Sequence, residues 1–169
     1  MVITDLVQIC LLGKKKRDEN SRFRSFMKSH HHSDLALRRI AEGIEEQIDC
    51  TACANCCKVA TVKLSERDIP RLARHLRTTP ARFKADYTME TPDEGIILRR
   101  SEESGCVFLD GRECTVYEAR PDTCQRFPHM VRGNGSIASR MWQFVDRACY
   151  CPIVYNSLEA FKDELGFKR

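Results

Sequence analysis

The stretch Cys50-Thr-Ala-Cys53-Ala-Asn-Cys56-Cys57 places four thiols within eight residues. Six further cysteines are spread along the chain, at positions 10, 106, 114, 124, 149 and 151. A small hydrophobic residue has no reason to recur at the spacing of the first four, whereas a soft metal ion needs converging thiolates. The sequence therefore predicts a protein organised around a cysteine-ligated metal site.

The length of the chain fits one ordinary hydrophobic core. It has 169 residues, of which 42% are hydrophobic and 8% aromatic. A chain of this size is too short for two domains of ordinary size. We expect an N-terminal helical extension over residues 1–32 and a cysteine-cluster metal-binding domain over residues 33–169.

The composition also bears on location and partners. No apolar run approaches the roughly 20 residues that a membrane span needs. Residues 1–12 include Asp5 and lack the basic start and the cleavage site of a signal peptide. We therefore expect a cytoplasmic protein with no membrane partner, where ten cysteines favour metal ligands over disulfides. The net charge of +4 counts each cysteine as a neutral thiol, and metal-bound thiolates lower it, so it does not indicate nucleic acid binding.

The hydrophobic pattern predicts an α+β fold, a small and mostly helical domain with short strands. Residues 33–34 and 65–68 offer helix caps, and Pro80 suits a first helical turn. Strands are expected at 59–64 and 96–99. Helices are expected over about residues 4–28, with a break near Gly13, and over about 34–47, 66–76, 80–87 and 157–165.

A hairpin is expected in the second half of the chain. Asp110-Gly111 is a tight-turn dipeptide between two β-rich segments, 107–109 and 114–117. Cys106 and Cys114 would then lie at the open end of the hairpin or just outside it. Pro121 and Pro128 bracket Cys124 with stiff turns. Such order favours these three cysteines as ligands, although each depends on the fold to bring it to the site.

The geometry of the first cluster leaves alternatives open. In a continuous helix Cys50, Cys53 and Cys57 would share one face and Cys56 would point away, whereas a loop could turn Cys56 to the metal. Tandem two-residue spacings followed by a remote Cys151-Pro152 resemble the ferredoxin arrangement around a [4Fe–4S] cluster. Zinc sites with four cysteines also use distant ligands. Zinc and an iron–sulfur cluster, in one site or two, therefore both remain possible.

The tandem cluster and the downstream segment Arg120-Pro121-x-x-Cys124-x-Arg126-Phe127-Pro128 resemble a bacterial cysteine-cluster family of the CxxCxxCC type, described as a putative zinc- or iron-chelating domain. The resemblance covers roughly residues 50–152, and Ile153 stands where members often have glycine. It implies metal chelation through the cysteines. The predicted ligands are Cys50, Cys53, Cys56, Cys57, Cys106, Cys114, Cys124 and Cys151.

The other candidate residues have simpler interpretations. Cys10 is expected in the core and Cys149 is less favoured than Cys151 as the last ligand. Arg120 and Arg126 could stabilise sulfur charge or could be surface residues. His129 and the run at residues 30–32 are interpreted as solvated loop histidines.

Three classes of function are compared. The first is a metal-binding protein whose metal ion organises the fold and serves metal or electron transfer, with an unknown protein partner. The second is an enzyme, since a flagellin lysine methylase is similar in its cysteine cluster, but this chain is shorter and lacks a glycine fingerprint, so no catalytic or organic-cofactor residues are predicted. The third is a nucleic-acid-binding zinc module, which needs a basic element beside the cluster. Residues 50–57 are uncharged, so nucleic acid is unlikely.

Overall fold

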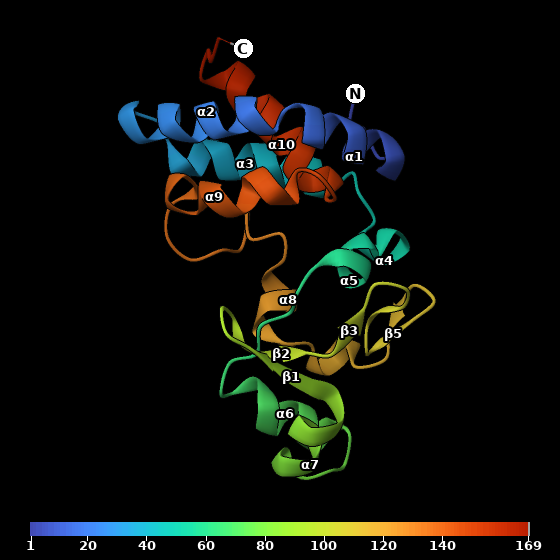
Figure 1. The fold of residues 1–169 in the computed structure, drawn as a ribbon. Helices are drawn as coiled ribbons and strands as arrows, with labels where there is room; N and C mark the ends of the chain where they lie inside the picture. The colour runs from blue at the N-terminus through green and yellow to red at the C-terminus, as the bar shows by residue number, and fades with distance from the viewer. Residues whose placement is uncertain (169) are drawn as a thin grey trace. The chain divides into compact units, whose positions relative to one another are not determined.

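The computed structural model describes residues 1–168 (Figure 1). Within them the chain is mostly helical and carries three short antiparallel strand pairs, which confirms the α+β class. The chain divides into two compact units. Unit 1 contains Met1–Asp49 and the chain from Pro128 onward, and unit 2 contains Cys50–Phe127. The first 32 residues thus belong to a larger unit, and the boundary after residue 32 stays a prediction.

Unit 1 is a bundle of helices (Figure 1). In it α10 contacts α3 and α1, and α2 contacts α9. Four of its helices bury one side, whereas the last helix is buried on nearly every side over residues 152–158. The side chains of Ile9, Phe23, Leu37, Phe144 and Leu158 are at most 1% exposed. The helices are α1 (Leu6–Lys15), α2 (Arg17–Ser29), α3 (Asp34–Glu45), α9 (Ile137–Arg147) and α10 (Pro152–Glu164).

The break in the first helical segment occurs at Lys16, three residues after the predicted position. Gly13 lies inside α1 and is buried. A Cβ atom there would lie 2.4 Å from the carbonyl oxygen of Ala148 and 2.6 Å from the Cα of Cys149. Glycine at position 13 therefore permits a close approach between α1 and the end of α9, and does not end the helix.

The last helix also starts earlier than predicted. Pro152 occupies its first turn after Cys151, where the missing N–H of proline costs nothing. Ser157, the predicted cap, lies inside α10 and is completely buried. The prediction was wrong because Ser157 resembles a cap only if the apolar residues 153–155 before it are taken as loop.

A buried ion network joins α2 to α10 in unit 1. The Nζ of Lys162, whose side chain is 0% exposed, lies 2.5 Å from the Oε1 of Glu19 and 2.6 Å from the Oε1 of Glu159. Lys16 forms an ion pair with the other carboxylate oxygen of Glu159. Because the lysine is enclosed, its positive charge requires both carboxylates.

Unit 2 consists of short elements. Its strand pairs are β1–β2, β3–β4 and β5–β6, each antiparallel. The helices are α4 (Cys50–Cys53), α5 (Asn55–Val59), α6 (Asp68–His75), α7 (Pro80–Tyr87), the 3-10 helix η1 (Tyr117–Ala119) and α8 (Asp122–Arg126). The strands are β1 (Thr88–Thr91), β2 (Gly95–Leu98), β3 (Arg100–Ser101), β4 (Gly105–Cys106), β5 (Leu109–Asp110) and β6 (Glu113–Cys114).

The predicted strand at 59–64 is only partly formed. Val59 ends α5, and Lys63 makes an isolated bridge to Ile97. The N–H of Leu64 donates to the carbonyl of Ile96 at 2.9 Å and the N–H of Leu98 donates to Val62 at 3.0 Å. This short segment therefore borders β2. Val62 and Leu64 join one apolar core with residues of α6, α7, β2 and η1.

Asp68 at the start of α6 ties this helix to the segment that begins α8. Its carboxylate accepts hydrogen bonds from the N–H of Ser65 at 2.8 Å and the hydroxyl of Ser65 at 2.7 Å. It also accepts from the N–H of Asp122 at 3.0 Å and from Arg71. Burial alone would raise the pKa of Asp68, but these hydrogen bonds outweigh it and hold the pKa below its ordinary value.

Replacing Asp68 with asparagine is expected to lower the free energy of unfolding by about 1.5–3 kcal/mol at pH 7, because an amide cannot accept all of these hydrogen bonds. A depressed pKa stabilises the fold above the unfolded-state value near 4, and this contribution is lost as the pH falls through the folded-state pKa. The difference between wild type and Asp68→Asn should therefore shrink below about pH 4. Urea unfolding of both proteins at pH 7 and pH 3.5 measures it, and a constant difference would contradict the assignment.

Candidate metal centre

The first cysteine cluster forms two short helices with a kink between them. Ala54, between α4 and α5, adopts a left-handed backbone with φ 46°, which is unfavourable for a residue with a Cβ atom. The N–H of Ala54 donates to the carbonyl of Cys50 at 3.0 Å, and the N–H of Cys57 donates to Ala54 at 3.1 Å. The kink reorients the two cysteines of α5 relative to those of α4. Neither a continuous helix nor an open loop describes this segment.

Strand β4 brings Cys106 to helix α5. Gly105, the residue before Cys106, has φ +74°, and a Cβ there would lie 2.7 Å from both the carbonyl oxygen of Cys57 and the Cα of Lys58. The guanidinium of Arg100, on the paired strand β3, donates to the carbonyl of Lys58 at 3.1 Å. Backbone of α5 and β4 is therefore in direct contact, so that Cys57 and Cys106 are neighbours.

Replacing Gly105 with alanine is expected to separate α5 from β4. Gly111→Ala is a matched control, because Gly111 also has a positive φ, +60°, but nothing lies within 4 Å of its Cβ position. The control should cost about 1–2 kcal/mol of stability from backbone strain alone. Gly105→Ala should cost about 1–2 kcal/mol more from the steric clash, and should reduce bound metal.

Thermal unfolding and metal content of both glycine variants measure this effect. If the two variants lose equal stability and equal metal, the α5–β4 contact has no part in holding the site.

Cys114 and Cys124 complete the group of cysteines along the core of unit 2. Cys114 ends β6 and pairs with Leu109 across a turn at residues 111–112. Cys124 lies in α8. Cys106 belongs to a different strand pair, β3–β4, just outside the predicted hairpin. These three half-buried side chains pack against the same apolar cluster. The structure thus brings Cys106, Cys114 and Cys124 to the same core.

The electrostatics of these thiols show that they act on one another. Burial and, after it, the charges of Cys106, Cys57 and Cys114 together raise the pKa of Cys124 to about 12. Burial likewise raises the pKa of Cys106 and of Cys114. By contrast, a hydrogen bond from Cys56 lowers the pKa of Cys57 to about 7, against the effect of burial. Without a cation, several thiolates in this space would repel one another.

Arg120 provides one positive charge beside the cysteines. Its guanidinium lies 3.6 Å from the centre of the Tyr117 ring, and its Nε donates to the carbonyl of Tyr117 at 3.0 Å. In this position its charge lowers the pKa of Cys57, Cys114 and Cys124, although burial dominates for the last two. One guanidinium cannot neutralise four thiolates.

The donor set of unit 2 fits a thiophilic metal ion. Within residues 1–168 no three side chains of His, Cys, Asp or Glu converge closely enough to hold an ion as they stand. The charge of Cys57 nevertheless acts on three other thiols, those of Cys106, Cys114 and Cys124. The four cysteines come from four separate elements, α5, β4, β6 and α8. Partly desolvated thiolates from separate elements are typical ligands of zinc and of iron–sulfur clusters.

Comparison with known proteins gives one family. Residues 49–152 match the model of the CxxCxxCC family, described as a putative zinc- or iron-chelating domain. The match spans more than half of the chain. The chain belongs to this family. All eight predicted ligands lie inside the matched segment. A search of curated proteins and a search of solved structures found no match.

The CxxCxxCC match also includes residues that lie in unit 1. Cys151, just before α10, is 6% exposed, and its charge favours the protonated form of Arg147, whose pKa is lowered mainly by burial. His129 lies in the loop before α9 with φ +71°, and its carbonyl accepts a hydrogen bond from Arg140. The ligand role of Cys151 stays a prediction.

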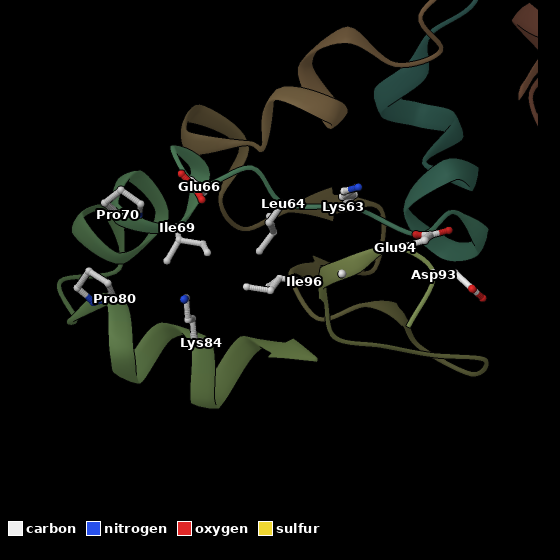
Figure 2. Close-up of a pocket in the computed structure, with 11 residues that line it drawn as sticks. Lys63, Leu64, Glu66, Ile69, Pro70, Pro80, Lys84, Asp93, Glu94 and Ile96 are labelled. Carbon is white, nitrogen blue, oxygen red and sulfur yellow. The ribbon is translucent and has the colours of Figure 1, made fainter. Parts of the chain in front are cut away.

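The CxxCxxCC protein also has a groove of about 600 Å³ in unit 2 (Figure 2). It lies between α6, α7 and the turn from β1 to β2, and its lining includes no cysteine. Its walls combine apolar side chains, Leu64, Ile69 and Ile96, with charges of both signs. The groove is therefore separate from the cysteine site. Separately, no helix within residues 1–168 is both long and apolar enough to cross a membrane.

Proposed function

We propose that this CxxCxxCC protein binds zinc or iron through the cysteines of unit 2, and that Cys57, Cys106, Cys114 and Cys124 are the central ligands. The observation that carries the proposal is the contact at Gly105. It sets the backbone of α5 against β4, so that Cys57 lies beside Cys106, which packs against the same apolar core as Cys114 and Cys124.

The metal ion organises the fold of unit 2. Strands β3 to β6 have two residues each, and α4, α5 and α8 have four or five. Elements of this length are not stable by themselves. Thiolates from four of them on one metal centre would cross-link the unit, and such binding supplies folding free energy.

The number of cysteines favours a second metal or a cluster. Unit 2 contains seven cysteines, and a structural zinc site uses four. Cys50, Cys53 and Cys56 are therefore the remaining predicted ligands, on α4 and at the start of α5, with Cys151 the eighth. Zinc would give a structural centre or one that passes metal on, whereas an iron–sulfur cluster would carry electrons at a potential set by burial and by Arg120.

Elemental analysis and a visible spectrum of anaerobically purified protein test the proposal. Brown, reducible absorption with bound iron identifies an iron–sulfur cluster, and a colourless protein with stoichiometric zinc identifies a zinc centre. Cys106, Cys114 and Cys124 should resist alkylation until a chelator removes the metal, because a metal-bound thiolate cannot attack the reagent. A folded protein with neither metal, or free alkylation of these thiols while metal stays bound, would contradict the proposal.

A further inference from the structure

Two cysteines outside the metal-binding unit lie at one helix contact. Cys10 is on α1 and Cys149 follows the end of α9, both in unit 1 and both half-buried. The contact is tight, because a Cβ on Gly13 would lie 2.6 Å from the Cα of Cys149. Cys10 precedes Gly13 by three residues, which places it one helical turn away on nearly the same face of α1.

This placement suits a disulfide. The Cα atoms of bonded cysteines are about 4.4–6.8 Å apart, and one helical turn, about 5.4 Å, is a displacement of the same size. The thiol of Cys149 makes a long hydrogen bond, 4.0 Å, to the carbonyl oxygen of Val145.

Charges of both signs flank this contact. Asp146, three residues before Cys149, forms an exposed ion pair with Arg17 at 2.5 Å, and Lys14 follows Gly13 on α1.

We propose that Cys10 and Cys149 form a reversible disulfide by exchange with a low-molecular-weight disulfide, for which oxidised glutathione is the probe. One protein thiolate attacks a sulfur of the reagent, which gives a mixed disulfide and releases one thiol. The second protein thiolate then attacks the protein sulfur of the mixed disulfide and releases the other thiol. The two protein thiols are oxidised by two electrons, the reagent disulfide is reduced by two, and each released thiolate takes up one of the two protons.

The consequence is a covalent link between α1 and the end of α9. It closes a loop that contains most of the chain, and a long closed loop restricts the unfolded state strongly. The redox state of the surroundings would thus set the stability of unit 1, independently of the metal ligands of unit 2.

The test uses the full metal-loaded protein under anaerobic conditions, incubated with oxidised glutathione and quenched with acid. Chymotrypsin cuts after Tyr150 and so separates Cys149 from Cys151 before mass spectrometry. We expect a linked pair of peptides that contain Cys10 and Cys149, unchanged metal content, and a melting temperature that rises by several degrees and falls again with dithiothreitol.

Cys10→Ser and Cys149→Ser are the matched variants. Each should lose the link and the rise in melting temperature while keeping the metal content of the wild type. The proposal is overturned if wild type carries only mixed disulfides with glutathione, if Cys10 is linked to Cys151, or if either variant loses metal.

Discussion

Replacing Cys57 with serine is expected to abolish metal binding and the cooperative unfolding of unit 2 together. Cys57 is the cysteine of α5 that faces the strand of Cys106 across the Gly105 contact. A structural metal contributes on the order of 10 kcal/mol to the folding of small cysteine-ligated domains, and the short elements of unit 2 have little to replace it. Metal analysis with circular dichroism melting would show a metal-poor protein whose transition is broad.

Cys10→Ser is the matched control, since it makes the same change at a cysteine of unit 1. It should keep full metal content under reducing conditions and lose only a packing contribution of roughly 1–2 kcal/mol. A Cys57→Ser protein with full metal content and a sharp transition would remove Cys57 from the ligand set.

Replacing Lys162 with methionine should destabilise unit 1 by about 3–5 kcal/mol, because it leaves the carboxylates of Glu19 and Glu159 without their shared cation. The lysine side chain is 0% exposed, and the two carboxylates are 16% and 19% exposed. Methionine fills much of the same volume, so packing alone explains little of the expected loss. Urea unfolding at neutral pH provides the free energy.

Arg82→Met provides the control for this variant. Arg82 pairs with Asp86 on α7, where the two side chains are 76% and 48% exposed, and such surface pairs contribute about 0.5 kcal/mol or less. If Lys162→Met costs no more than Arg82→Met, the buried network does not stabilise unit 1.

Several elements could be predicted because their signals are local. Ser33 caps α3 through the N–H of Ala36, and Thr79 caps α7 through the N–H of Arg82, as expected from a hydroxyl before an apolar run. The family could also be recognised, because its motifs are local in the sequence and do not depend on tertiary contacts. These motifs are the spacing of Cys50 to Cys57 and the Arg-Pro-x-x-Cys segment.

Features that depend on tertiary contacts could not be predicted. Gly13 and Gly105 resemble ordinary glycines in the sequence, yet each marks a place where two backbones touch. Lys162 lies in a segment of ordinary helical pattern. Its burial depends on an ion pair with Glu19, which is 143 residues away in the sequence.

The candidate site shows the same limit. Cysteine spacing identified the ligand candidates, but it could not show the kink at Ala54 or that Cys106 and Cys114 lie in different strand pairs. The choice of Cys151 over Cys149 as the last ligand stays a prediction. Their neighbours, Arg147 for Cys151 and Cys10 for Cys149, come from the packing of unit 1.

X-ray absorption at the metal edge of the anaerobically purified protein tests the central claim most directly. If thiolates bind the metal, its first coordination shell should contain only sulfur, at about 2.3 Å. The Cys124→Ser variant should lose sulfur from that shell. A first shell dominated by nitrogen or oxygen, or a sulfur shell that Cys124→Ser leaves unchanged, would contradict it.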